Sequence, residues 1–78
     1  MQDELRRVLG DVFGLDEADV TDDLTPETLE GWDSLNHLRL VTALEEAFGI
    51  KLTMAEIESM MTSVGRLREV VERHTVVT

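Results

Sequence analysis

Apolar residues recur with a helical period over the first thirteen positions. The apolar positions are Leu5, Val8, Leu9, Val12 and Phe13. Their spacing of i, i+3, i+4, i+7 and i+8 lines one face of an α-helix. Gly14 follows directly, and glycine after the last periodic residue is a typical helix stop. The pattern therefore predicts an amphipathic helix over residues 2–13.

The most regular pattern covers residues 34–48. The apolar residues assigned to one side of this segment are Leu38, Leu40, Val41, Leu44, Ala47 and Phe48. Asp33 is a suitable N-cap, and Gly49 a suitable C-terminal stop, so we expect a helix over 34–48. On a helical wheel Leu35 lies roughly 140° from the centre of the apolar stripe. We therefore expect Leu35 to face water in the first turn.

Two shorter helices are predicted in the last third of the chain. Thr53 followed by Glu56 has the spacing of a capping box and opens a short helix over 54–61. Thr62 or Ser63 can then cap a last helix over 64–74. Its apolar stripe consists of Val64, Leu67, Val70 and Val71. His74 stands at its end, where a cation favours the helix dipole.

Residues 14–33 are predicted to form a long loop. They hold the only proline, Pro26, and their apolar residues are too scattered for a periodic helix. The apolar residues within the loop are Leu15, Val20, Leu24 and Leu29. We expect them to pin the loop to the core at intervals, which is how a long connection stays ordered.

The four helices are too short to be stable alone, so each must bury its apolar stripe against the others. The 78 residues, of 8.8 kDa, suffice for one small domain over 1–78. The predicted fold class is therefore all-α: a small four-helix bundle with a long loop between its first and second helices, and we expect it to be monomeric.

The charge of the chain is strongly negative and uneven. Seven Lys and Arg stand against 17 Asp and Glu, a formal net charge of −10. Residues 11–33 carry nine acidic residues and no Lys or Arg. This balance argues against binding nucleic acid. Because the chain has no cysteine, a disulfide framework, a thiolate metal site and a cysteine nucleophile are excluded.

No run of consecutive apolar residues in this chain is longer than two, whereas a membrane-spanning helix needs about 20. We therefore expect no membrane association and a cytoplasmic location. The apolar content of 42% argues against disorder.

Candidate chemistry gathers where the loop meets the second helix. Leu35 and Trp32 flank Asp33 and Ser34, and they would make a compact docking spot beside an exposed hydroxyl. A phosphate at Ser34 would suit the positive end of the helix dipole, although Asp33 opposes it. The plain alternative is that Ser34 is a first-turn residue and Leu35 an ordinary exposed leucine.

The motifs of this region resemble the acyl carrier protein family. The resemblance rests on residues 31–35 (GWDSL), on Leu38 and Leu40 to Val41, on residues 43–49 (ALEEAFG) and on residues 63–67 (SVGRL), and it extends over almost the whole chain. It implies that Ser34 receives 4′-phosphopantetheine from coenzyme A, through a separate Mg²⁺-dependent phosphopantetheinyl transferase. The thiol of that group would carry acyl intermediates as thioesters, so the chain would be a carrier and not an enzyme.

The resemblance also implies a surface for partner enzymes, namely acyl-loading ligases or acyltransferases and ketosynthase-type enzymes. Its candidate residues are Trp32, Asp33, Leu35, Arg39, Thr42, Glu45 and Glu46, with Glu56 and Ile57 on the third helix. Asn36 and Arg39 stand where bacterial fatty-acid carriers usually have acidic residues. The Gly-Trp-Asp-Ser-Leu form looks more like free-standing carriers of polyketide or mixed nonribosomal pathways. Fatty-acid biosynthesis, an aminoacyl or peptidyl carrier, and an acidic helical interaction module stay open as alternatives.

The residue types of two other chemistries are also present in the chain. Asp33, Ser34 and His37 contain the residue types of a serine hydrolase, but no glycine flanks the serine as in Gly-x-Ser-x-Gly. Four loop residues occupy positions 1, 3, 5 and 12 of a calcium-loop count: Asp19, Thr21, Asp23 and Glu30. Leu24 stands where that loop needs glycine, so we expect a solvated loop and no metal.

Three methionines follow the second helix, Met54, Met60 and Met61. Flexible thioether side chains repack readily, so these residues could line an expandable pocket for an acyl chain. The alternative, which we favour, is that they fill the core.

Overall fold

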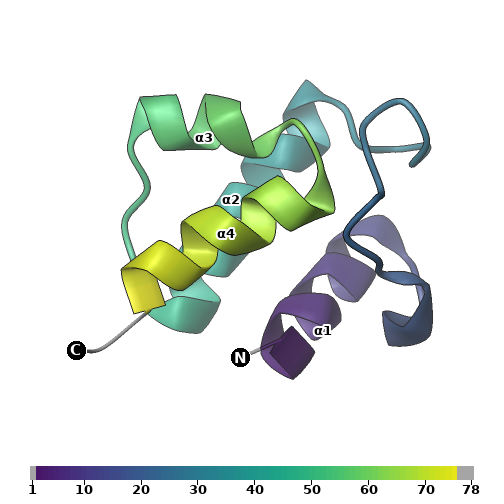
Figure 1. Ribbon diagram of the computed structural model, residues 1–78, viewed down its shortest axis with the longest axis horizontal. Helices are drawn as coiled ribbons and strands as arrows, with labels where there is room; N and C mark the ends of the chain where they lie inside the picture. The colour runs from purple at the N-terminus through teal and green to yellow at the C-terminus, as the bar shows by residue number, and fades with distance from the viewer. Residues whose placement is uncertain (1, 76–78) are drawn as a thin grey trace.

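A computed structural model describes residues 2–75 of the chain (Figure 1). Its elements are α1 (Gln2–Phe13), the 3₁₀ turn η1 (Glu17–Asp19), α2 (Ser34–Phe48), α3 (Met54–Met60) and α4 (Val64–Thr75). This part of the chain contains four α-helices and no strand, which confirms the all-α fold class. None of these helices has the length and the apolar content needed to span a bilayer.

The predicted capping residues set the ends of the helices. Asp33 accepts a hydrogen bond from the Asn36 N–H at the start of α2, and Gly49 ends that helix in the left-handed conformation, at φ 64°. The capping box of Thr53 and Glu56 is complete at the start of α3. Local sequence therefore fixes where these helices begin and end.

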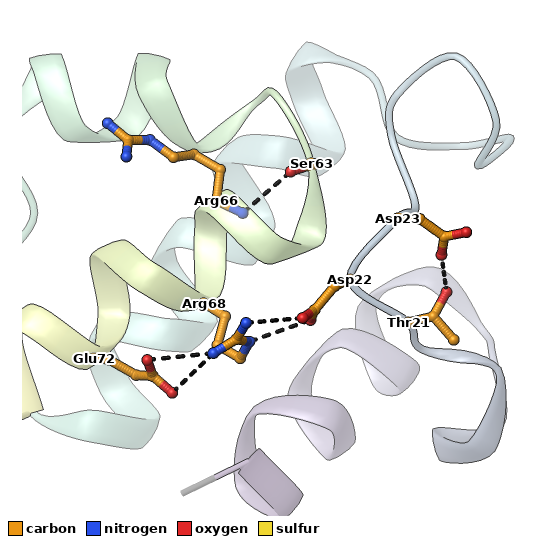
Figure 2. Close-up of polar contacts among 7 residues, drawn as sticks. All are labelled: Thr21, Asp22, Asp23, Ser63, Arg66, Arg68 and Glu72. Atoms are coloured by element: carbon orange, nitrogen blue, oxygen red, sulfur yellow. Dashed lines mark hydrogen bonds and ion pairs between the residues drawn. The ribbon is translucent and has the colours of Figure 1, made fainter.

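The start of α4 is capped by Ser63, one of the two residues proposed for this role. The Ser63 hydroxyl accepts from the Arg66 N–H at 3.1 Å (Figure 2). Thr62 instead donates its hydroxyl proton to the Ser59 carbonyl, at 2.8 Å. At the other end the helix reaches Thr75, one residue beyond the predicted range.

All four helices contribute to one apolar core. The largest fully buried side chains are Leu9, Leu40, Leu44, Met60, Leu67, Val70 and Val71. In Figure 1, α4 crosses the middle of the molecule, α3 lies along one edge and α1 lies on the opposite side. The core therefore sits where α4 faces α1 and α2.

The inner face of α2 differs in part from the prediction. It consists of His37, Leu40, Val41 and Leu44. Leu38, which was assigned to the buried stripe, is 56% exposed, so that assignment is wrong. Leu38 follows His37 by one residue, a rotation of about 100°, which turns its side chain to the edge of the helix. Ala47, which was also assigned to the apolar side, is exposed, and Ala43 packs against the core in addition to the residues expected there.

The long loop is pinned to the core as expected. Val20 and Leu29 are buried, and Leu15 and Leu24 pack against the core as partly buried residues. The 3₁₀ turn η1 adds a short piece of order that the sequence pattern did not indicate.

The loop is also tied to the start of α4 by polar contacts. The Val64 N–H donates to the Leu24 carbonyl and the Gly65 N–H donates to the Asp22 carbonyl, each at 2.9 Å. These bonds satisfy N–H groups that a helix start leaves without an intrahelical partner. The Arg68 guanidinium reaches the Asp22 carboxylate at 2.8 Å and also contacts Glu72 (Figure 2).

The contact with Arg68 changes the titration of the loop. Hydrogen bonding from the Arg68 guanidinium lowers the pKa of the Asp22 carboxyl below its ordinary value of 3.8. Figure 2 also shows the Thr21 hydroxyl hydrogen-bonded to Asp23, directly beside this contact. The middle of the acidic loop is thus held in place by α4.

Candidate functional site

Ser34 is the first residue of α2 and is exposed. The carboxylate of the preceding residue, Asp33, accepts from the Asn36 N–H at 2.9 Å, and the Asp33 carbonyl accepts from the His37 N–H at 2.8 Å. Within residues 2–75 the Ser34 hydroxyl itself forms no hydrogen bond. The helix start is therefore capped by Asp33, and the serine oxygen is left free.

The turn that leads to Ser34 is held by further hydrogen bonds. The Asn36 side-chain amide donates to the Gly31 carbonyl at 2.6 Å. The Trp32 N–H donates to the Leu29 carbonyl at 3.2 Å. Because both bonds bridge the turn and its flanks, the backbone around Ser34 has a fixed path while its hydroxyl points away from internal partners.

Trp32 lies in the core and not on the surface. Its side chain is 3% exposed, its indole N–H donates to His37 Nδ1 at 3.0 Å, and its ring lies 5.7 Å from the Phe13 ring. The prediction that Trp32 contributes to a docking spot is therefore wrong. A large aromatic ring whose one polar atom has a buried partner gains most from burial.

His37 is a core histidine whose two ring nitrogens both have hydrogen-bond partners. It is 4% exposed, and its Nε2 lies 2.7 Å from the Ile57 carbonyl oxygen. Both ring nitrogens are thus engaged, one with Trp32 and one with Ile57. Neither nitrogen is available to take a proton from Ser34, so the arrangement of a serine hydrolase is not formed.

An open groove of about 500 Å³ runs beside Ser34 between α2 and α3. It is lined by Ser34, His37, Leu38, Ile57, Glu58 and Met61. The sequence pattern did not indicate Leu38 or Glu58 as residues of this site, whereas Met61 was a candidate for a pocket lining, although core filling was the favoured alternative. A signal was present for Leu38, because residues four apart lie on the same face of a helix and Leu38 follows Ser34 by four.

Three large apolar residues of α2 and α3 are exposed, and one of them, Leu38, lines this groove. Leu35 is 60% exposed, which confirms the expectation from the helical wheel, and Met54 at the start of α3 is 71% exposed. Of the three methionines only Met60 is fully buried as core filler. Met61 is half-buried and lines the groove.

The proposed partner residues of α2 fall into two groups. Arg39, Thr42 and Glu46 are exposed on its outer side. Glu45 is half-buried, and its carboxylate accepts from the Leu52 N–H at 2.9 Å. Glu45 therefore holds the segment between α2 and α3 and offers less of its charge to a partner.

Glu56 is likewise engaged within the molecule. Its carboxylate accepts from the Thr53 N–H at 2.9 Å and lies 2.7 Å from His74 Nε2. The hydrogen bond from Thr53 and then that from His74 lower the pKa of Glu56 below its ordinary value. His74, which was expected to interact with the dipole of its own helix, thus joins α4 to α3. Ile57, the other α3 candidate, is half-buried in the groove.

The acidic loop does not assemble a metal site within the described residues. In residues 2–75 no three His, Cys, Asp or Glu side chains come together in a way that could hold an ion. Of the four residues in the calcium-loop count, Thr21 and Asp23 bond to each other. All four are exposed.

The fold and this site define a small helical domain that presents one free hydroxyl at a helix start, beside an apolar groove. The family model described as "Phosphopantetheine attachment site" matches residues 3–71. A polyketide-8 synthase acyl carrier protein 2 from Streptomyces avermitilis is 36% identical over 64 residues, which are 82% of this chain and 74% of the relative. An acyl carrier protein from Rubrobacter xylanophilus is 36% identical over 73 residues, 92% of this chain and 89% of the relative.

The chain therefore belongs to the acyl carrier protein family, whose domain is the attachment site of phosphopantetheine. The geometry fits such a group, because an exposed serine oxygen free of internal hydrogen bonds stands at the positive end of the α2 dipole. The all-α bundle is the fold class that the apolar stripes of the sequence predicted.

Proposed function

We propose that Ser34 is the residue that bears 4′-phosphopantetheine and that this chain carries acyl groups on it. One observation carries the proposal. The chain has three serines, and the other two use their hydroxyl groups internally: Ser63 caps α4, and Ser59 accepts from Arg66 Nε at 2.8 Å. Ser34 alone combines exposure with a hydroxyl that has no hydrogen bond to any residue of 2–75.

The attachment is a phosphoryl transfer from coenzyme A. The Ser34 oxygen forms a bond to the pantetheine-side phosphorus, the pyrophosphate P–O bond breaks, and 3′,5′-ADP leaves. The hydroxyl proton passes to a base of the phosphopantetheinyl transferase, since His37 has both ring nitrogens engaged. When bound, the group supplies the thiol that a chain without cysteine lacks.

The residues around Ser34 keep this attachment point ordered and accessible. Asp33 opposes a phosphate by its charge, but its carboxylate is directed to the Asn36 N–H and so is partly neutralised. The α2 dipole favours the phosphate at this end. The chain itself therefore contributes position and accessibility, and we assign it no catalytic step.

We further propose that the carrier serves polyketide or related biosynthesis, with acyl-loading and ketosynthase-type enzymes of the cytoplasm as partners. The Streptomyces avermitilis relative is named for a polyketide synthase. The outer side of α2 supports this choice over fatty-acid synthesis, because Asn36 and Arg39 replace acidic residues there. The exposed Leu35 and the acidic residues Asp33 and Glu46 would meet a partner surface that is both apolar and basic.

The attachment site is tested by intact mass. The protein is incubated with coenzyme A, Mg²⁺ and a transferase of broad specificity, beside Ser34→Ala and the matched control Ser59→Ala. We expect the wild type and the control to gain one phosphopantetheine group and Ser34→Ala to gain none. Modification of Ser34→Ala, or an unmodified wild type, would contradict the proposal.

The cargo is tested on the modified protein. Malonyl, acyl and aminoacyl donors are offered with their respective loading enzymes, and the thioesters are read by mass. We expect malonyl or acyl loading. Loading by aminoacyl donors alone would show a peptidyl carrier of a nonribosomal pathway instead.

A further inference from the structure

The hydrogen bonds of His37 determine its protonation state. The Trp32 indole N–H can only donate, so His37 Nδ1, 3.0 Å away, must carry a lone pair. The Ile57 carbonyl can only accept, so His37 Nε2, 2.7 Å away, must carry the proton. The buried ring is therefore neutral, with its proton on Nε2, and each of its nitrogens has one partner.

This ring connects three parts of the molecule at the groove. Trp32 belongs to the turn before Ser34, His37 belongs to α2, and Ile57 belongs to α3. Within residues 2–75 the bond from His37 to Ile57 is the one hydrogen bond that joins α2 directly to α3. His37 and Ile57 also both line the groove beside Ser34.

A second proton on His37 is incompatible with these contacts. It would sit on Nδ1 and face the Trp32 indole N–H, so that two donors would meet at 3.0 Å without an acceptor. The charged ring would also lie 4% exposed, and burying a charge without an ionic partner is costly. The ring lines the open groove, which gives it a route to water.

We propose that neutral His37 is a positioning residue that holds α3 against α2, and that its protonation turns the ring into the groove and releases α3. The groove beside Ser34 would then widen as the pH falls. Any effect of the wider groove on a group attached to Ser34 rests on the proposed function. The protonation of His37 concerns the unmodified chain and is independent of that function.

The charged groups on the elements next to His37 do not stabilise a protonated ring in its present position. On α3, Glu58 lines the same groove, and Glu56 is bonded to Thr53 and His74. At the start of α2, the Asp33 carboxylate is bonded to the Asn36 N–H. On the side of α1, the neutral ring of Phe13 packs against Trp32. None of these carboxylates is hydrogen-bonded to the His37 ring, so none holds an added charge inside.

His74 provides the matched control, because it also contacts α3 but with the opposite response. Its contact with the Glu56 carboxylate is an ion pair only when the ring is protonated, so acid strengthens this contact. The His37 contact is made by the neutral ring, so acid breaks it. The direction of the change in α3 thus distinguishes the two histidines, which are the only ones in the chain.

The test follows the unmodified protein from about pH 8 to about pH 5, the range in which histidine charges change. Trp32 is the single tryptophan, so its emission reports on its contact with His37. Amide exchange over α3 reports on the attachment of that helix, and ¹⁵N spectra report which ring nitrogen carries the proton. At about pH 8 we expect the proton on Nε2 of His37. As the pH falls, Trp32 emission should decrease and amide exchange in α3 should become at least tenfold faster, and both changes should have the same midpoint.

Two variants separate the histidines. His37→Gln keeps one donor and one acceptor but takes up no proton in this range, so both changes should vanish. His74→Gln should retain them. Any of three results would overturn the proposal. The proton could lie on Nδ1 of His37 at about pH 8, or amide exchange in α3 could stay slow while His37 is protonated. The pH profiles of the wild type and His37→Gln could also be superimposable. Since phosphopantetheine transfer is read separately by mass, failure here leaves the proposed function standing.

Discussion

The two sides of this molecule are stabilised in different ways. We call the contact of loop residues 14–33 with α1 and α4 the anchored side. There, backbone hydrogen bonds from Val64 and Gly65 and the Asp22–Arg68 ion pair tie the loop down. We call the groove between α2 and α3 the open side. One hydrogen bond, from His37 to Ile57, joins these two helices directly within residues 2–75.

The difference separates the part of this very small domain that anchors the loop from the part that exposes apolar side chains, which the proposed function assigns to recognition. The anchored side uses the charges of Asp22 and Arg68 internally and leaves the loop apolar residues covered. The open side leaves Leu35 and Leu38 exposed on the first turns of α2, which begins with Ser34, and Met54 exposed at the start of α3. Substitutions on the two sides should therefore affect different measurements.

The largest expected effect comes from the core that both sides share. Leu67 of α4 is fully buried, so Leu67→Ala leaves a cavity and should lower the free energy of unfolding by about 2 to 5 kcal/mol. Urea denaturation measures this loss. A loss no larger than that of Leu38→Ala would show that burial does not distinguish these leucines.

A slightly smaller effect is expected where α1 meets the loop. A Cβ on Gly10 would lie 2.6 Å from the Leu15 carbonyl oxygen, and the Leu15 N–H bonds to the Gly10 carbonyl. Alanine favours a helix by about 1 kcal/mol over glycine, but the clash with backbone should outweigh this gain. We expect Gly10→Ala to destabilise the protein by about 1 to 3 kcal/mol in urea denaturation. A more stable variant would mean that the loop can shift freely.

The ion pair of the anchored side should have a modest effect that depends on pH. The folded-state pKa of Asp22 is lowered, so its contribution is present above the unfolded value near 3.8 and is lost as pH falls through the folded value. Because the Asp22 side chain is 59% exposed, solvent screening limits the contribution to less than about 1 kcal/mol.

Asp22→Asn tests this contribution. The variant should be slightly less stable than the wild type near neutral pH, and the two should converge in acid below the unfolded value of 3.8. Thermal melts over this pH range measure the difference. A gap that persists unchanged in strong acid would assign the effect to packing and not to charge.

The smallest effect on stability is expected on the open side. Leu35→Ala and Leu38→Ala remove mostly exposed side chains, so each should change the free energy of unfolding by no more than about 0.5 kcal/mol. Under the proposed function, Leu35→Ala should nevertheless slow loading or turnover by partner enzymes. If Leu35→Ala kept full partner activity but was much less stable, Leu35 would contribute to structural order and not to recognition.

Much of the local structure could be predicted from the sequence. Asp33, Thr53 and Ser63 cap the helices for which the pattern proposed them, and Leu35 faces solvent. These features follow from interactions within a few residues, which a short stretch of sequence contains in full. The Gly-Trp-Asp-Ser-Leu motif around Ser34 is local in the same sense, and the comparisons support the family that it indicated.

The features that could not be predicted depend on contacts between distant segments. Trp32 was placed on the surface because nothing in its neighbourhood shows that Phe13 lies beside it. The pairing of His74 with Glu56 joins two helices whose packing the sequence pattern leaves open. For Leu38, one residue's rotation decides whether a side chain enters the core or the groove.

The helices, their caps, the uneven charge and the exposed serine could thus be predicted from the amino-acid sequence, because hydrogen bonds and periodicity within one segment suffice for these. The burial of Trp32, the hydrogen bonds of His37 and the groove beside Ser34 became visible only in the folded chain. Each of these arises where the loop, α2 and α3 meet, and the free energy of such a contact belongs to the packing of all three segments together.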